Sequence, residues 1–256
     1  MEKRLFGAPS AWSRCPAGMA HRLEFVISSE ILRRFPDFVC GVVVCQGADN
    51  SGESSRLSGL LREAESDVRR RFTLERLPDE PFFAAWRRAY ASFGTDPTKS
   101  KCSSEALVRR VLKGSQIRHI SKLVDAYNYL SLKYRTPVGG EDLTSMSGES
   151  IELKVADGQE HFVALGEADS EPVEAGEVVY AVGNEVLCRR WNWRESEVTK
   201  LTEATKDAFL VIDALPPLTK DDVNRAAGDL AGLVSSECGA KTTVFRLDAE
   251  THRASW

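Results

Sequence analysis

The amino-acid sequence predicts an α+β fold with largely antiparallel sheets, in a single domain that spans residues 1–256. Three observations lead to this prediction. Strand-like and helix-like segments come in mixed order, without the regular alternation that a doubly wound sheet requires. Residues 38–45 are apolar at every position but one glycine, which is typical of a central strand buried on both faces. With 42% hydrophobic residues, a chain of 256 residues can form one substantial core.

The first half of the chain combines two predicted strands with four predicted helices. The strands are expected at residues 22–28 and 38–45, and the helices at residues 57–72, 82–93, 103–112 and 120–135. Pro81 suits the first turn of the second helix, and Gly94 suits its C-terminal cap. The Ser103-Ser104-Glu105 segment is expected to cap the third helix.

The fourth helix stops before Pro137, because proline lacks an amide hydrogen and clashes with the preceding helical turn. Its apolar residues share one face. A second face gathers the polar residues Ser121, Asp125, Asn128 and Arg135. This second face is either a solvated surface or the wall of a pocket. The following Pro-Val-Gly-Gly sequence predicts a turn, in which Gly139 and Gly140 allow a peptide group to approach a ligand or another strand closely.

The second half of the chain is expected to be richer in strands. Predicted strands lie at residues 151–155, 161–165, 177–182, 185–191, 208–215 and 242–247. The first two are expected to pair as a hairpin across Asp157-Gly158, and the next two across Gly183-Asn184. Thr219 and Asp222 resemble a capping box, and they precede a helix with a clean apolar stripe.

Composition argues against several classes of protein. The formal net charge of −4 gives no global reason to expect a nucleic-acid partner, so any basic surface must be local. The first twenty residues do not resemble a secretory signal, and no apolar run is long enough for a membrane span. The six cysteines are scattered without a Cys-x-x-Cys pair. We therefore expect reduced thiols in a cytoplasmic protein that does not contact a membrane.

Familiar catalytic and cofactor motifs are absent. The sequence contains no Gly-x-Gly-x-x-Gly, P-loop, His-Glu-x-x-His or Gly-x-Ser-x-Gly motif, so the corresponding dinucleotide, nucleotide, zinc and hydrolase assignments lose their usual support. The four histidines have no evident triad partners and no metal-binding spacing, which makes a structural or surface role the simpler interpretation. We expect no cofactor and no metal.

A second unusual segment, residues 187–196, crowds two tryptophans and three arginines near the end of a predicted strand. If the strand continues, alternation places Trp191 and Trp193 on one face and Arg190 and Arg194 on the other. The simpler interpretation is a tryptophan pair in the core with exposed arginines. The functional interpretation is a stacking and anion-binding surface for nucleotides or an aminoacyl ester.

These segments together resemble a known family. Residues 123–128, Leu-Val-Asp-Ala-Tyr-Asn, followed by residues 137–142, Pro-Val-Gly-Gly-Glu-Asp, are similar to a motif of the B3/B4 domain in the β-subunit of bacterial phenylalanyl-tRNA synthetases. Residues 86–90 and 105–114 upstream, and 176–180 and 188–194 downstream, resemble stand-alone B3/B4 proteins. The resemblance covers residues 82–215.

The resemblance implies a mixed β-sandwich core flanked by helices, with a central pocket that edits wrongly charged tRNA by hydrolysing the aminoacyl ester. It implies an enzyme that positions ester and water and takes much of its chemical assistance from the substrate. Its partner would be aminoacylated tRNA. The oligomeric state, the amino acid and the tRNA are not predicted.

The resemblance also assigns residues. The predicted pocket consists of Asp125, Asn128, Pro137, Gly139, Gly140, Glu141 and Glu185. The predicted tRNA contacts are Arg109, Arg110, Lys113, Arg189, Arg190, Trp191, Trp193 and Arg194. Gly139 departs from the family pattern, because the bacterial synthetase domain has a pocket histidine there.

Two alternatives to a deacylase remain open at this point. The chain could be a module that binds tRNA or an amino acid in the same pocket without turnover. It could also be a metabolic enzyme that uses the pocket for a free amino-acid-like ligand.

Overall fold

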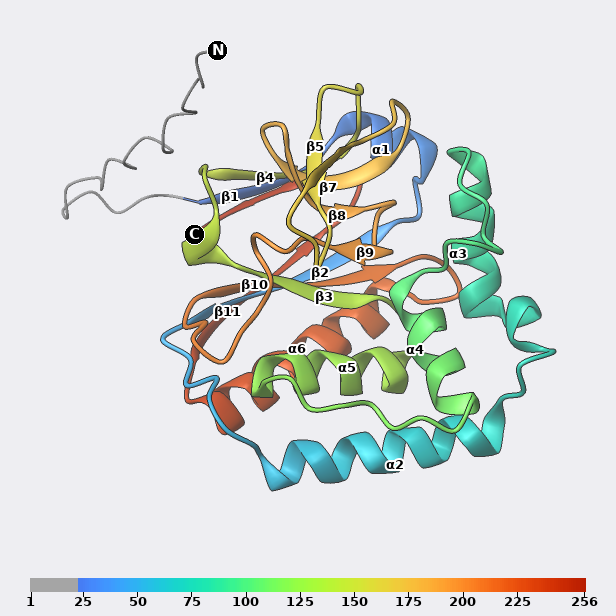
Figure 1. The fold of residues 1–256 in the computed structure, drawn as a ribbon, viewed down its shortest axis with the longest axis vertical. Helices are drawn as coiled ribbons and strands as arrows, with labels where there is room; N and C mark the ends of the chain where they lie inside the picture. Colours follow the sequence, from blue (N-terminus) through green and yellow to red (C-terminus); the bar gives the residue numbers. More distant parts are fainter. Residues whose placement is uncertain (1–22) are drawn as a thin grey trace, which may run out of the picture.

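Two β-sheets and six α-helices make up residues 23–256, the part of the chain that the computed structural model describes. The sheets lie one above the other, and helices cover the outer face of the smaller sheet (Figure 1). The fold class is therefore α+β with two largely antiparallel sheets, as the sequence predicts.

The larger sheet has eight strands, seven of them in the order β12-β1-β4-β7-β8-β5-β6, and β9 pairs with β8. Their bounds are β1 Glu24–Ile27, β4 Ser150–Val155, β5 His161–Val163, β6 Ser170–Pro172, β7 Val178–Val182, β8 Glu185–Arg189, β9 Arg194–Glu195 and β12 Arg253–Ser255. The β1–β4 and β5–β8 pairs are parallel, and the other pairs are antiparallel.

The smaller sheet has four strands in the order β11-β2-β10-β3, all antiparallel. Their bounds are β2 Val39–Gln46, β3 Val138–Asp142, β10 Ala208–Ala214 and β11 Lys241–Leu247. The two central strands are buried on both faces. This confirms the central position that the continuous apolar run of β2 predicts.

Alternation along the central strands divides the hydrophobic core in two. On β10, Phe209 and Val211 face the larger sheet, whereas Leu210 and Ile212 face the helices. Strand β2 is divided in the same way. One sheet thus serves two cores, which ties the larger sheet to the helical layer.

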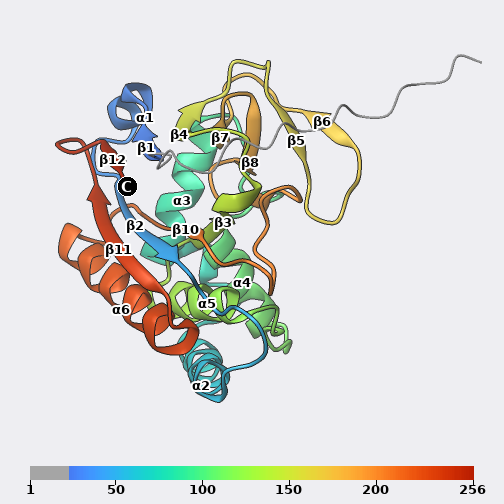
Figure 2. The same ribbon diagram turned by 90° about the vertical axis from the view of Figure 1, so that its left-hand side faces the viewer.

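The helices are α1 Ser29–Arg34, α2 Ser55–Arg71, α3 Pro81–Ser92, α4 Ser103–Leu112, α5 Lys122–Tyr134 and α6 Lys220–Cys238. Helices α5 and α6 cover the four-stranded sheet, and α2 lies beneath α5 on the outside (Figure 2). The capping box of Thr219 and Asp222 starts α6, as predicted. Between residues 23 and 256, no helix has both the length and the apolar character needed to cross a bilayer.

Several local predictions are wrong. Residues 151–155 and 161–165 do not form a hairpin, because β4 pairs with β1 and β7, and β5 pairs with β6 and β8. Cys102, not the serine segment, is the N-cap of α4, and no side chain caps that helix. Residues after Pro137 were expected to form a turn, but they form strand β3. The two glycines let this strand lie close against β10. Helix α1 and the short strands β6, β9 and β12 have no predicted counterpart.

Gly140 and Gly139 offer a matched test of this close approach. A Cβ atom at Gly140 would overlap the Leu210 side chain and lie 3.0 Å from the Phe209 carbonyl oxygen, whereas at Gly139 the nearest atom is 4.0 Å away. We expect Gly140→Ala to lower the free energy of unfolding in urea by about 1–3 kcal/mol. Gly139→Ala should change it by less than about 1 kcal/mol. Equal losses in the two variants would contradict the packing described.

Candidate functional site

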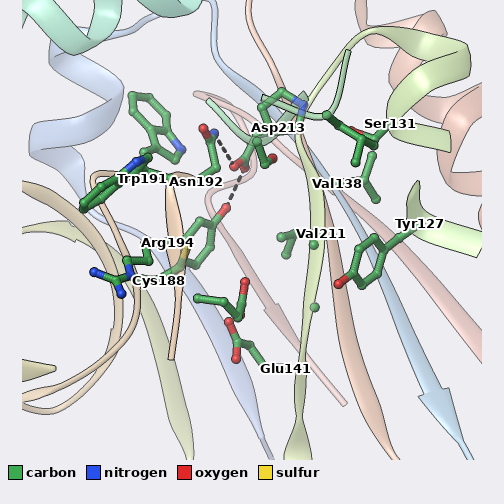
Figure 3. Close-up of a pocket in the computed structure, with 18 of the residues that line it drawn as sticks. Tyr127, Ser131, Val138, Glu141, Cys188, Trp191, Asn192, Arg194, Val211 and Asp213 are labelled. Carbon is green, nitrogen blue, oxygen red and sulfur yellow. Dashed lines mark hydrogen bonds between the residues drawn. The ribbon is translucent and has the colours of Figure 1, made fainter. Parts of the chain in front are cut away.

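A pocket of about 390 Å³ lies between the two sheets, bounded by β3, α5 and the β8–β9 connection (Figure 3). Its wall residues come from distant parts of the sequence. They include Ser103, Leu107 and Arg110 of α4, Tyr127, Asn128 and Ser131 of α5, residues 137–141, Cys188, residues 191–195, and Phe209, Val211 and Asp213 of β10, with Leu165 and Tyr180.

Helix α5 and strand β3 build one wall. The helix ends at Arg135, whose left-handed φ of 58° turns the chain back, and Pro137 leads directly into the strand. This reversal places Asn128 and Glu141 in the same pocket. The Asn128 side chain forms no hydrogen bond to any residue between 23 and 256, so its amide is free to bind a ligand.

Asp213 is the centre of a buried polar network. Its carboxyl accepts hydrogen bonds from the Tyr180 hydroxyl at 2.6 Å and from Asn192 Nδ2 at 3.0 Å (Figure 3). Tyr90 in turn donates to Asn192 Oδ1 at 2.9 Å. Burial raises the pKa of Asp213 to about 6, because desolvation outweighs the hydrogen bonds that stabilise its charged form.

Glu141 and Glu195 form a second acidic group in the pocket. The Thr199 hydroxyl donates to Glu141 Oε2 at 2.5 Å, and Glu195 Oε1 is buried without a hydrogen-bond partner among residues 23–256. Burial raises the pKa of both carboxyls, and their proximity raises that of Glu141 further. Two adjacent buried carboxyls do not both ionise readily, so this pair is expected to share a proton.

The chain after β8 does not continue as a strand, so the alternation predicted for the tryptophan segment is wrong. Arg190 and Trp191 both have positive φ, 49° and 68°, and the turn carries Trp191 into the core. There its indole is completely buried and contacts Trp86 edge-on, with ring centroids 5.1 Å apart. Trp193 stays partly exposed, beneath the Arg190 guanidinium at 4.6 Å.

Two of the predicted pocket residues lie elsewhere. Asp125 is buried on another side of α5, where its Oδ2 is 2.6 Å from His119 Nδ1. Three positions along a helix lie only about 60° apart around its axis, and here this difference places Asn128 in the pocket and Asp125 outside it. Glu185 begins β8 and accepts a hydrogen bond from Ser147. The other predicted pocket residues, Asn128, Pro137, Gly139, Gly140 and Glu141, all line the pocket.

The predicted tRNA-binding arginines differ in their availability. Arg109 and Arg189 are engaged within the protein, Arg109 with the buried Glu105 at 2.7 Å, and Arg189 with Glu177 and Glu171. Arg190 donates to Ser100. Available cations at or near the pocket are the exposed Arg110 and Lys113 on and just after α4, and the partly exposed Arg194.

The pocket also contains residues that the sequence analysis missed: Tyr180, Cys188, Asn192, Glu195 and Asp213. One signal was present for Asp213, because it is the only charged residue in the apolar run of β10. A charge there should have suggested a buried site. Glu195 carries no such signal, since only the turn after β8 brings it to the pocket.

The pocket offers no activated nucleophile or imidazole base from the described residues. Burial and the three neighbouring carboxyls raise the pKa of Cys188 well above its usual value, so its thiolate is disfavoured. None of the histidines among residues 23–256 lines the pocket. Within the same range, no group of three or more His, Cys, Asp or Glu side chains is arranged to hold a metal ion.

Comparison with known proteins identifies related sequences and folds. Residues 85–238 match the family model of the B3/4 domain. An N-terminal fragment of the phenylalanyl-tRNA synthetase β-subunit from Pyrococcus horikoshii is similar in structure, with a TM-score of 0.44 and 14% sequence identity. The alignment covers 88% of this chain and 53% of that fragment, so the chain spans about half the fragment's length. No curated protein matches the chain significantly.

The buried glutamates predict a pH-dependent stability difference. A carboxyl whose pKa is raised on folding stabilises the folded state at low pH, and this contribution is lost as pH rises through its folded pKa. We therefore expect Glu141→Gln to become more stable relative to wild type as pH rises from about 5 to about 8. Urea unfolding across this range measures the difference. The exposed Glu203→Gln should show a flat difference, and a flat difference for Glu141→Gln would contradict the assignment.

Proposed function

Since this chain belongs to the B3/4 domain family, which in the phenylalanyl-tRNA synthetase β-subunit is linked to tRNA editing, we propose that it hydrolyses a mischarged aminoacyl-tRNA. The pocket between the sheets would hold the acyl group, and a water molecule would attack the ester carbonyl. The bond between the carbonyl carbon and the ribose oxygen then breaks. The products are the free amino acid and a tRNA whose terminal ribose carries a hydroxyl. The chain would act on tRNA charged by another protein.

The observation that carries this proposal is the free amide of Asn128 in the pocket wall. Asn128 Nδ2 is a donor without a partner in the described part of the chain, which suits it to bind the ester carbonyl as negative charge develops on the oxygen. The raised pKa of Cys188 argues against a covalent acyl-enzyme. Catalysis would then rest on positioning the ester and water, assisted by the vicinal ribose hydroxyl.

The mouth of the pocket suits the end of a tRNA. Arg110 and Arg194 line the pocket, and Lys113 follows one turn beyond Arg110 at the end of α4. Trp193 has a partly exposed indole beside Arg194, whose guanidinium lies 6.0 Å from the ring centroid. Together these side chains would provide phosphate contacts and a stacking surface for the terminal adenosine.

A non-catalytic binding module is the second candidate. It is favoured by Gly139, which supplies no side chain where the synthetase domain has a histidine, and by the lack of an imidazole in the described pocket. Such a module would bind aminoacylated tRNA at the same mouth, and the ester would persist.

Hydrolysis is tested with a panel of tRNAs, each acylated with a non-cognate amino acid, at micromolar protein. We expect at least one ester to be lost faster than in buffer. Asn128→Ala should slow this loss by about tenfold or more, because one hydrogen bond to a charged oxygen contributes roughly 1.5–3 kcal/mol. The exposed Asn224→Ala on α6 is the matched control and should keep the wild-type rate. No acceleration for any ester would rule out a deacylase, and persistent binding would then favour the module.

Binding of tRNA is tested separately by its salt dependence. Replacing both Arg110 and Arg194 with alanine should weaken binding and reduce the slope of log K against log salt by about one to two. Arg253→Ala, an exposed arginine on the edge strand β12, should leave both unchanged. Filter binding between about 50 and 200 mM salt measures the slopes. If Arg253→Ala has the same effect as the double variant, tRNA does not approach through the pocket mouth.

A further inference from the structure

The three carboxyls of the pocket have no cationic partner among residues 23–256. Within residues 23–256, none of Glu141, Glu195 and Asp213 forms an ion pair. Asp213 and Glu141 accept hydrogen bonds from hydroxyl and amide groups, and Glu195 interacts with Glu141. Several other buried carboxyls are paired with cations, although the Asp142 carboxyl in the same range is bonded only to Thr144 and Thr205. Examples are Glu65 with Arg62, Glu105 with Arg87, Glu160 with Lys154 and Glu177 with Arg189. An unpaired buried carboxylate is costly, so a cationic ligand would bind here with a large electrostatic gain.

The carboxyls lie in two groups at opposite ends of the pocket. Asp213 lies at one end with Asn192, and Glu141 lies at the other, with Val211 between them (Figure 3). Burial raises the pKa of all three carboxyls, and a cationic ligand beside them would favour their ionised form. The pocket therefore presents two acidic ends separated by an apolar wall.

An unpaired atom in the pocket wall points to a missing ligand. Among residues 23–256, no group donates a hydrogen bond to the buried Glu195 Oε1. Glu195 lines the pocket. Native proteins rarely leave such atoms unpaired, so a ligand that supplies an N–H donor to Glu195 would complete the site.

We propose that the acyl group that this pocket accepts is a diamino acid with an unbranched aliphatic stem, such as lysine or ornithine. This inference rests on the proposed function, because it names the substrate class of that site. One ammonium would bind Asp213 and the other would bind the Glu141–Glu195 pair, with the methylene stem against Val211. The α-ammonium occupies one end in every aminoacyl ester, so the second acidic end is what distinguishes a diamino acid from an apolar one.

Hydrolysis of closely matched esters tests the proposal. One tRNA is acylated in vitro with lysine, ornithine, norleucine, phenylalanine or tyrosine, and the rate in buffer is subtracted. Norleucine keeps the lysine stem but lacks its terminal ammonium. We expect the lysyl or ornithyl ester to be hydrolysed at least about tenfold faster than the norleucyl ester, as one charge-assisted contact implies. Equal or faster hydrolysis of the norleucyl, phenylalanyl or tyrosyl ester would overturn the proposal and leave the deacylase function standing.

A binding measurement tests this inference independently of the deacylase activity. Calorimetry compares lysinamide with norleucinamide, neither of which carries an ester. Tighter binding of lysinamide supports the inference even if no ester is hydrolysed, whereas equal binding or none overturns it.

Variants locate the second ammonium. In variants that are shown to be folded, either Glu141→Gln or Asp213→Asn should reduce the ratio of the lysinamide affinity to the norleucinamide affinity to near one. The exposed control Glu203→Gln should keep the wild-type ratio. A preference that survives both pocket variants would also overturn the proposal.

Discussion

Strand β10 is buried on both faces, and this constraint organises the molecule. Its side chains alternate between the core under the larger sheet and the core over the helices, so neither layer can be separated from it. Asp213 interrupts that apolar alternation near the end of the strand. A carboxyl in this position must be hydrogen-bonded, and Tyr180 and Asn192 supply the bonds from the larger sheet and the connection after β8. The fold thus builds a polar pocket inside an otherwise apolar contact between sheets.

The turn after β8 completes the pocket. Two consecutive residues with positive φ direct Trp191 into the aromatic core and bring Asn192 and Glu195 to the cavity. Left-handed backbone at non-glycine residues costs roughly 1–2 kcal/mol each, which the burial of Trp191 against Trp86, Phe35 and Phe38 can offset. Local backbone strain and aromatic packing therefore position the polar groups on which the proposed chemistry depends.

Much of the fold could be predicted from the sequence, because its signals are local. Continuous apolar runs predict the central strands, helical periodicity predicts α2 to α6, and Pro137 predicts the end of α5. Short strands such as β9 and β12 could not be predicted, since two or three residues have no period of their own. The hairpin predicted at Asp157-Gly158 failed because the partners of β4 and β5 are chosen by tertiary packing.

The candidate site was predictable only in part. Asn128 and Glu141 lie in a continuous motif, and both line the pocket. Glu195 and Tyr180 reach it through contacts distant in sequence, which no spacing rule reveals. Asp125 was predicted to line the pocket and Arg109 to contact tRNA. Instead, Asp125 is paired with His119 and Arg109 with Glu105, so neither side chain is available for these roles. The functional roles of the pocket residues, and the extent of the chain as one domain, stay predictions.

The most direct test of the central claim is a crystal structure with a non-hydrolysable aminoacyl adenosine, in which an amide replaces the ester. We expect the acyl group between the two sheets, its carbonyl oxygen within hydrogen-bonding distance of Asn128 Nδ2 and the adenosine beside Trp193 and Arg194. An analogue bound on another surface, with the pocket empty, would contradict the account.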